Sequence, residues 1–591
     1  MAYWHLLVNR STAPWQQAHQ VSSAAQRLKS FLSGNRAFFV HLALIVLSAW
    51  LVFNWYETVR RIIASYLPLP FMDYWRVVLD YPQWQAHDFR FLWNQHNEHR
   101  ILFPEIVFLL DMSVWHGKEY LPLAVSFLCY FSIWVVIAWT LAADNHLSCF
   151  HRALPILLTG IVIGWKGSAS ALPFPFLLQW TLTQFCAIAA LFLITDSKGR
   201  NRWLTLAITS TAIATYSSGN GMLLWPVLVI AGFLLRLTKL QILALIASAV
   251  VSVGLYFVGY RFSHDLNLAN FIRHPLYSLS FIGVYLSMPF GNMKSPTFGV
   301  YIGLANLAIA IGLFAYAARE RLLPTRQSVV LFGTYCFTLL TALITAAGRM
   351  DVADDTFTAA KADRYVTVPL VNWAVLISLT LWLASRRRWR IAPAPVLAFC
   401  FAVLLAIGCL QLRAWLRTDD EYFADAQAAM LSIEDDLDVP ELMKKDFPDP
   451  RLIRAGLPLL RRDHLSIYYK GRTRWLGQPA SRYGPLATGS VSGAVTKTVP
   501  VSGGLEVFGW ADDRPDVPRY RWIVLVNDAG QIAGFGERFP AGPVPNSPAP
   551  NTPRSLSWIG FVNLRVGSAS FHAYLIDPDR RGLFPIPASQ F

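Results

Sequence analysis

The chain has 591 residues, of which 54% are hydrophobic and 15% are charged, and its formal net charge is +15. Soluble proteins carry charge on roughly a quarter of their residues. Together with long apolar runs that recur from residue 37 to 412, this composition excludes a soluble cytoplasmic enzyme, a disordered chain and a fibrous repeat. The sequence therefore predicts a multi-pass α-helical membrane protein with a water-soluble C-terminal part.

A polar N-terminal segment, residues 1–36, precedes the first apolar run. We expect about eleven membrane spans within a module at 37–412. Three of them are marginal, because two are short and one contains an arginine. The spans lie near 37–55, 120–142, 148–165, 176–195, 203–217, 222–235, 240–260, 297–318, 328–347, 366–384 and 391–412.

Basic side chains gather on one side of these spans. The N-terminal segment and alternate loops, ending with the arginine run at 386–390, hold 17 Lys or Arg against 3 acids. Because basic loops translocate poorly, this side is expected to be cytoplasmic. The N-terminus is then inside, and after eleven crossings the C-terminal part is outside. The soluble part has no basic cluster that could follow a nucleic-acid backbone, so we expect no nucleic-acid partner.

The first outer loop, residues 56–119, is long and rich in aromatic and ionisable side chains. We expect an amphipathic helix at 100–116, lying on the membrane interface. Asp73 lies close to that interface. Its carboxylate could act as a general base whose pKa is set by partial burial and nearby cations. The alternative is a helix cap or a solvated aspartate.

The densest polar cluster of this loop consists of His96, Asn97, Glu98, His99 and Arg100. In a helix, His96 and His99 would share one face. Two histidines and a carboxylate could hold a divalent metal such as Mg²⁺ or Mn²⁺, but the spacing differs from that of the His-Glu-x-x-His zinc helix. We therefore favour hydrogen bonding to a hydroxyl-rich substrate and assign no metal ligand. A structural cap is the other alternative.

Two further outer turns carry polar residues. Lys166 follows a span, and Asn220 lies in the Ser-Ser-Gly-Asn-Gly turn at 217–221. Both are candidates for binding substrate. A simple hairpin between two helices would equally require the glycines of this turn.

The loop at 348–367 places Arg349 at the mouth of one span and Arg364 with Tyr365 at the mouth of the next. Two guanidinium groups at one rim could neutralise a phosphate or a pyrophosphate, because each donates hydrogen bonds in a planar fork. The same arginines could instead pair with the aspartates of the loop.

The C-terminal part divides into two regions. Residues 413–493 are expected to form a helical linker region with two amphipathic pieces. From 494 to 591, short alternating runs between turn residues predict a small β-sandwich. Its exposed aromatic side chains could stack on sugar rings or could dock the domain on the membrane half.

The layout as a whole resembles the GT-C class of integral-membrane glycosyltransferases, which use polyprenyl-phosphate sugars. It has an inside N-terminus, an acid in a long first outer loop, about eleven spans and an extracytoplasmic C-terminal domain. The sequence HNEHRILFP at 96–104, the Ser-Gly-Asn-Gly turn and the Arg-Tyr pair at 364–365 are similar to bacterial members. The resemblance implies a location in the bacterial inner membrane, with the C-terminal domain in the periplasm.

The resemblance also implies an inverting sugar transfer from a polyprenyl-phosphate donor to an envelope glycan or lipid acceptor. Asp73 is the position that matches the catalytic base of the class. The loop lacks the paired acids common there, so Asp80, Asp88 and Glu98 stay as rival bases and metal dependence stays open. Arg349 and Arg364 would stabilise the departing phosphate.

Other functions fit the same layout. A polysaccharide or lipid transporter or flippase is one alternative, although such proteins place ionisable residues inside their spans. A polysaccharide ligase of the O-antigen type, or an acyltransferase, would share the outward-facing site. A non-catalytic envelope assembly protein is the remaining class.

Overall fold

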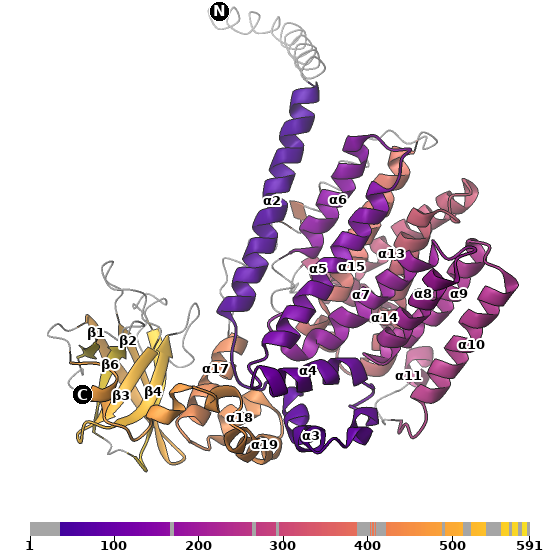
Figure 1. Cartoon of the computed structure of the whole chain (residues 1–591). Helices are drawn as coiled ribbons and strands as arrows, with labels where there is room; N and C mark the ends of the chain where they lie inside the picture. The colour runs from indigo at the N-terminus through magenta and orange to yellow at the C-terminus, as the bar shows by residue number, and fades with distance from the viewer. Residues whose placement is uncertain are drawn as a thin grey trace, which may run out of the picture.

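The computed structural model describes residues 36–165, 171–262, 268–290, 295–386, 402, 405, 406, 408, 421–486, 491–511, 522–538, 557–566, 570–576 and 582–587. Its N-terminal part is a bundle of helices, and its C-terminal part is a β-sheet flanked by shorter helices (Figure 1). The bundle helices are α2 (Arg36–Ala64), α3 (Tyr74–Gln85), α4 (Leu102–Val114), α5 (Tyr120–Ala142), α6 (Cys149–Ile163), α7 (Leu178–Ile194), α8 (Asn201–Thr215), α9 (Leu224–Leu234), α10 (Lys239–Tyr256), α11 (Leu268–Arg273), α12 (Pro275–Ser287), α13 (Pro296–Arg319), α14 (Arg326–Arg349) and α15 (Thr367–Ser385).

Seven helices of the described chain are long and apolar enough to cross a membrane. They include α2, α5, α7, α10, α13, α14 and α15. The expected spans at 148–165, 203–217 and 222–235 coincide with α6, α8 and α9, which have 15, 15 and 11 residues. These are shorter than the roughly 20 residues that a bilayer core requires. The expected span at 391–412 falls almost wholly outside the described residues.

Helix α15 is the centre of the bundle, and all 18 residues of its most apolar window are buried. It packs between α6 and α14, so it has no face left for lipid. Its polar groups find partners inside: the Asn372 amide donates to Thr338 Oγ1 across 2.9 Å, and Ser378 pairs with Thr159. Such bonds matter because an unpaired polar group in an apolar interior is costly.

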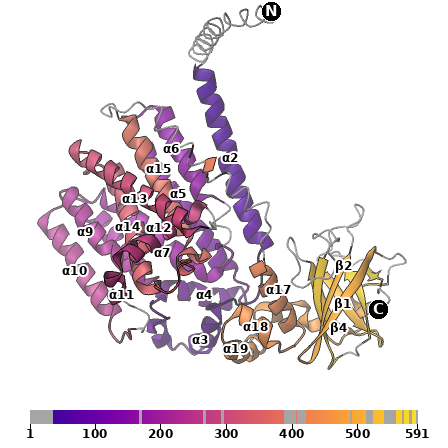
Figure 2. The same ribbon diagram turned by 180° about the vertical axis from the view of Figure 1, so that it is seen from behind.

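Helices α12 and α13 pack closely against each other beside α14 and α15, on the side of the bundle that faces the viewer in Figure 2. Their contact depends on two glycines. A Cβ atom on Gly303 would lie 2.2 Å from the Gly283 carbonyl oxygen, so only glycine allows this approach. Small residues at a helix crossing are typical of membrane proteins, where close van der Waals packing drives helix association.

Helices α3 and α4 lie across one end of the bundle (Figure 1). Helix α4 agrees with the expected amphipathic helix at 100–116. Their aromatic side chains share a core in which the Tyr74 and Phe108 rings are 5.1 Å apart and Phe108 stacks on Phe176 at 5.5 Å. We call this end of the bundle the α3–α4 end.

The region expected as a helical linker contains three described helices, which pack on the α3–α4 end. These are α17 (Glu421–Glu434), α18 (Pro440–Asp446) and α19 (Pro450–Arg462). The indole of Trp75 donates to Asp446 Oδ2 across 2.5 Å, and Gly456 lets α19 approach the same indole ring. Residues between 430 and 468 therefore share a hydrophobic core with the first loop.

The strands form one antiparallel sheet in the order β1-β2-β5-β4-β3-β6-β7. The expected β-sandwich needs two packed sheets, so that expectation is corrected. Glycines allow the sheet to curl, since a Cβ on Gly534 or Gly560 would collide with the backbone of the neighbouring strand. One face packs on α17 and the other is filled by apolar side chains. The strands are β1 (Gly493–Val501), β2 (Gly504–Ala511), β3 (Trp522–Asn527), β4 (Ile532–Arg538), β5 (Ser557–Asn563), β6 (Phe571–Ile576) and β7 (Leu583–Ile586).

Candidate functional site

The polar cluster of the first loop folds as a tight turn and not as a helix. The His96 N–H donates to the His99 carbonyl across 2.7 Å, and the His99 N–H donates back across 2.9 Å. Asn97 closes the turn with a positive φ of 51°, which asparagine tolerates better than most residues. Its side chain is exposed, and its carbonyl accepts a hydrogen bond from Gln95. The turn brings the two histidines together at the α3–α4 end.

Asp73 immediately precedes α3 and faces this turn. Its Oδ2 lies 3.8 Å from His96 Nε2, and the imidazole packs on the Phe176 ring at 5.0 Å. Burial opposes ionisation of Asp73, but the contact with His96 and the charges of Arg76 and Arg364 outweigh it and lower the pKa of this carboxyl. Asp73 is therefore a carboxylate at neutral pH. Its carboxylate is 34% exposed, so a ligand can reach it.

Glu98 joins the turn to the end of α14. Its carboxylate accepts a hydrogen bond from Arg349 across 2.8 Å. Its backbone carbonyl accepts from the hydroxyls of Tyr256 and Tyr260, at 3.2 Å and 3.1 Å. Arg349 thus has a carboxylate partner within the protein, from the first loop and not from the aspartates of its own loop.

His99 contacts the 217–221 turn. The Gly219 N–H donates to His99 Nδ1 across 3.2 Å, so this nitrogen is the unprotonated one and Nε2 carries the proton. Burial of the ring, with the nearby Arg349 and His96, lowers the pKa of His99 to about 4 although Glu98 opposes the shift. At neutral pH His99 is a neutral hydrogen-bond donor.

Three buried polar atoms in the histidine turn and the 217–221 turn have no hydrogen-bond partner among the described residues. They are His96 Nε2, Ser218 Oγ and Asn220 Nδ2. Buried polar atoms are nearly always hydrogen-bonded, so unpaired ones require an explanation such as a missing ligand or water. His96 and Asn220 are among the residues predicted from the sequence, and Ser218 is not.

Arg100 has a role in holding the turn in place. It is 2% exposed, and its guanidinium donates to the carbonyls of Tyr256, at 2.7 Å, and Val258, at 2.5 Å, and also to that of Trp93. Helix α10 ends at Tyr256, where backbone carbonyls are left without helical partners. The guanidinium therefore fixes the first loop to the end of α10, and these bonds leave it little capacity for a substrate.

Arg364 is an exposed cation whose charge, after that of Arg76, helps to lower the pKa of Asp73. It forms no ion pair with another residue of the described chain, and its guanidinium lies 4.9 Å from the Tyr365 ring. Tyr365 itself is buried against Trp180 and Tyr285. Lys166 lies outside the described residues.

Asp80 of α3 and Glu105 of α4 form an acid pair that the sequence did not predict. Asp80 and Glu105 share a hydrogen bond, and burial together with Asp80 raises the pKa of Glu105 to about 8. Burial likewise raises the pKa of Asp80, although His96 and Arg76 counteract it. The spacing of Asp73, Arg76 and Asp80 could have indicated that these three residues share a helix face, because residues three and four apart are neighbours on a helix, but it gives no signal for Glu105.

The three acids that could replace Asp73 as the catalytic base, Asp80, Asp88 and Glu98, have different surroundings. Asp88 forms an exposed pair with Arg90 at 2.7 Å. Glu98 is bonded to Arg349, and Asp80 is bonded to Glu105. Asp73 combines a lowered pKa with a neighbouring histidine and the charge of an exposed cation, Arg364.

No group of three or more His, Cys, Asp or Glu side chains within the described part of the chain could hold a metal ion.

No family model, curated protein or solved structure matches this chain.

The site thus rests on its own geometry. It combines a carboxylate paired with a histidine, a neutral histidine that donates a hydrogen bond, and an exposed guanidinium. Such a group can accept a proton from a hydroxyl, orient further hydroxyls and offset negative charge on a phosphate.

Proposed function

We propose that this protein is a glycosyltransferase of the GT-C type, which transfers a sugar from a polyprenyl-phosphate donor to an envelope glycan or lipid acceptor. The observation that carries the proposal is the contact of the Asp73 carboxylate with His96, beside Arg364, at the end of an apolar helix bundle. Apolar helices offer a surface for an isoprenoid chain, and the polar site at their end suits the sugar phosphate.

The reaction would be a direct displacement at the anomeric carbon. Asp73 takes the proton of the acceptor hydroxyl while its oxygen forms a bond to that carbon. The bond from the anomeric carbon to the phosphate oxygen breaks, and polyprenyl phosphate leaves with the electron pair. Attack from the face opposite to the leaving group inverts the anomeric centre.

Positive charge would stabilise the departing phosphate. Arg364 is exposed and has no carboxylate partner among the described residues, so it is the first candidate. Arg349 can contribute only while it shares its charge with Glu98. Preorganised donors at the point where charge develops are a large source of rate enhancement.

The unpaired buried groups would bind sugar hydroxyls. Neutral His99 can donate through Nε2, and Ser218 and Asn220 add an unpaired hydroxyl and an unpaired amide nitrogen. A polyhydroxylated ligand would supply the partners that these atoms lack. The reaction would take place on the periplasmic face of a bacterial inner membrane, a location that rests on the distribution of Lys and Arg among the loops.

A transfer assay tests this proposal. The purified full chain in liposomes is incubated with polyprenyl-phosphate hexose or polyprenyl-phosphate pentose, radiolabelled in the sugar, and with envelope lipid extract as the acceptor source. We expect release of polyprenyl phosphate with transfer of label, and a loss of about 100-fold or more in Asp73→Asn. Asp88→Asn, which removes a surface carboxylate from the same loop, is the control.

Several outcomes would contradict the proposal. Equal rates of sugar transfer by Asp73→Asn and by the parent protein would show that Asp73 is not the catalytic base. Movement of intact labelled lipid across the liposome membrane without bond cleavage would favour a flippase. Transfer of an acyl group, with the sugar phosphate left intact, would favour an acyltransferase.

A further inference from the structure

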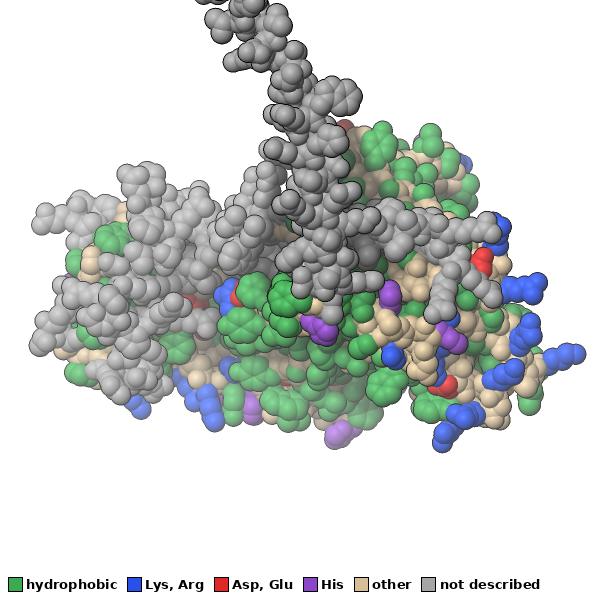
Figure 3. Space-filling view, turned by 90° about the horizontal axis from the view of Figure 1, so that it is seen from above, with side chains coloured by type: hydrophobic (Ala, Val, Ile, Leu, Met, Phe, Trp, Pro, Cys, Tyr) green, Lys and Arg blue, Asp and Glu red, His purple; other side chains and the backbone are tan. Residues whose placement is uncertain are grey.

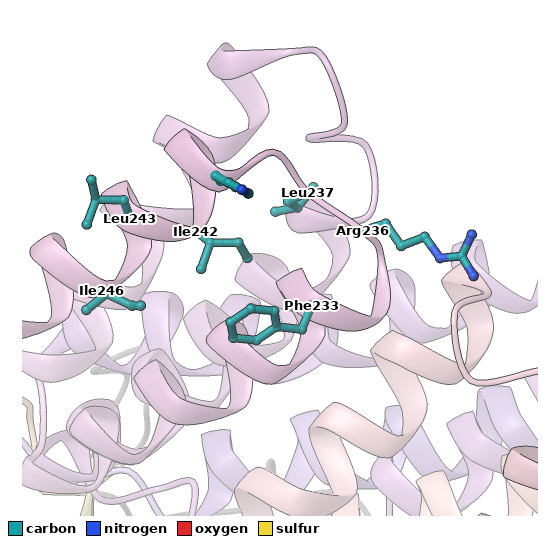
Figure 4. Close-up of a pocket in the computed structure, with 7 residues that line it drawn as sticks. Phe233, Arg236, Leu237, Ile242, Leu243 and Ile246 are labelled. Atoms are coloured by element: carbon teal, nitrogen blue, oxygen red, sulfur yellow. The ribbon is translucent and has the colours of Figure 1, made fainter.

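A second site lies at the opposite end of the bundle, where α9 turns into α10. A cavity of about 450 Å³ opens between the two helices, and its apolar wall includes Phe233, Leu237, Ile242, Leu243 and Ile246 (Figure 4). It is one helix length away from the Asp73 site, because α9 begins next to the 219–223 turn that contacts His99.

The cavity opens outward from the bundle and not into its core. Phe233 is 62% exposed, Leu243 is 61% exposed and Ile246 is 41% exposed, whereas Leu237 and Ile242 form the buried floor. Helix α10 meets the length and composition of a membrane span. Exposed apolar side chains on such a helix face hydrocarbon, so an acyl chain is the natural occupant of this groove.

Positive charge surrounds the polar end of the groove. Arg236 and Lys239 belong to its lining, and both are exposed with no ion pair to a described residue. Figure 4 shows the Arg236 guanidinium extending away from the apolar side chains, beyond the end of the groove. That direction places the charge where the headgroup of a lipid would lie if its tail filled the groove.

The start of α10 adds backbone donors. Thr238 caps the helix through a reciprocal pair of bonds with Gln241. The N–H groups of Lys239 and Leu240 precede the first helical hydrogen bonds and have no partner in the described chain. Free N–H groups at a helix start attract anions, and here they lie beside two cations.

The neighbouring turn between α7 and α8 adds further basic side chains to Arg236 and Lys239. Gln241 donates to the Ser197 carbonyl across 2.8 Å and so joins the two turns. The acid of that turn, Asp196, is bonded to Arg326. Viewed along the bundle axis, blue side chains gather on the side where α8, α9 and α10 lie (Figure 3). The exposed cations of the two turns are Lys198, Arg200, Arg202, Arg236 and Lys239.

We infer that the α9–α10 groove binds an anionic phospholipid of the membrane, with an acyl chain against Phe233, Leu243 and Ile246 and the phosphate beside Lys239 and Arg236. An apolar groove alone would accept any lipid tail. The five cations of these turns select a lipid of net negative charge, since each Lys or Arg near a membrane surface contributes about 1 kcal/mol to binding an anionic lipid. This inference does not depend on the proposed sugar transfer.

Native mass spectrometry of the delipidated full chain in detergent tests the site. The probes are dioleoyl phosphatidylglycerol, dioleoyl phosphatidylcholine and inorganic phosphate. We expect the parent protein to retain phosphatidylglycerol over phosphatidylcholine, and each of Arg236→Gln and Lys239→Gln to weaken that retention about fivefold. Leu243→Trp fills the groove without a change in charge and should lower retention of both lipids.

Arg319→Gln with Arg321→Gln is the matched control, because it removes two exposed charges at the same end of the bundle, one from the last residue of α13 and one from the turn that follows. Its phosphatidylglycerol retention should equal that of the parent protein, and thermal unfolding checks that each variant is folded. Equal loss in this control would indicate diffuse charge attraction and overturn the inference. Unchanged retention in the Arg236 and Lys239 variants, or displacement of the lipid by inorganic phosphate, would also overturn it.

Discussion

Arg349, the last residue of α14, donates to the Glu98 carboxylate across 2.8 Å and thereby ties the main bundle to the histidine turn. The two residues are separated by 251 positions in the chain. The Glu98 side chain is 17% exposed and that of Arg349 is 37% exposed, so the pair is screened only in part from water.

This pair should stabilise the α3–α4 end. We expect Glu98→Gln and Arg349→Gln each to lower the free energy of unfolding by about 1 kcal/mol, after allowance for solvent screening. The double variant should lose less than the sum of the two, because the second change removes a charge that has already lost its partner. Thermal unfolding in detergent measures the three variants, and strict additivity would contradict a direct interaction.

The two arginines of the 348–367 loop should differ in their effect on turnover. Arg364 is exposed beside Asp73, whereas Arg349 is bonded to Glu98. In the sugar-transfer assay we expect Arg364→Gln to lower kcat by about 100-fold, as for other groups that stabilise developing charge. Arg349→Gln should lower kcat less while it lowers stability more.

Arg273→Gln is the control for this comparison, since Arg273 is an exposed cation of α11. A larger loss of kcat in Arg349→Gln than in Arg364→Gln would reverse the assignment of the phosphate contact.

Gly219 should be intolerant of a side chain. A Cβ atom there would lie 3.0 Å from His99 Nδ1 and 3.1 Å from the Tyr256 hydroxyl, so both neighbours would have to move. We expect Gly219→Ala to destabilise the protein by about 1 kcal/mol, as overpacking does, and to displace His99. Gly254→Ala is the matched control in α10, because its Cβ would meet no atom within 4 Å. It should be neutral or slightly stabilising, and equal losses in both variants would disprove the steric explanation.

Glu105 should make stability fall as pH rises. Burial and the neighbouring Asp80 raise its pKa from the ordinary 4.5 to about 8. The folded protein therefore binds more protons than the unfolded chain between these values. Its contribution to stability is complete below about pH 4.5 and is lost as the pH rises through about 8.

A comparison of variants isolates this effect. Between about pH 5 and pH 9, the unfolding temperature of the parent protein should fall relative to that of Glu105→Gln, because glutamine stays neutral. Asp88→Asn should show no such trend, since hydrogen bonding to Arg90 holds the pKa of Asp88 at about 2. If the unfolding temperatures of the parent protein and Glu105→Gln changed in parallel with pH, the pKa of Glu105 would not be raised in the folded protein.

The sequence alone determined the helical class of the bundle, because hydropathy and length are local properties. All expected spans up to 366–384 coincide with helices, and the alternating runs near the C-terminus form strands. It also selected residues that the fold brings together, including Asp73, His96 and Glu98.

Only the tertiary structure decided how these residues are used. Arg100 belongs to the same cluster as His96, yet its guanidinium binds carbonyls at the end of α10. Arg349 pairs with a distant carboxylate and not with its own loop, and residues between 430 and 468 join the core of the first loop. Local patterns report which face of a segment is apolar. The partner of a polar side chain depends on which distant segments pack beside it, and a single sequence does not contain that information in any local form.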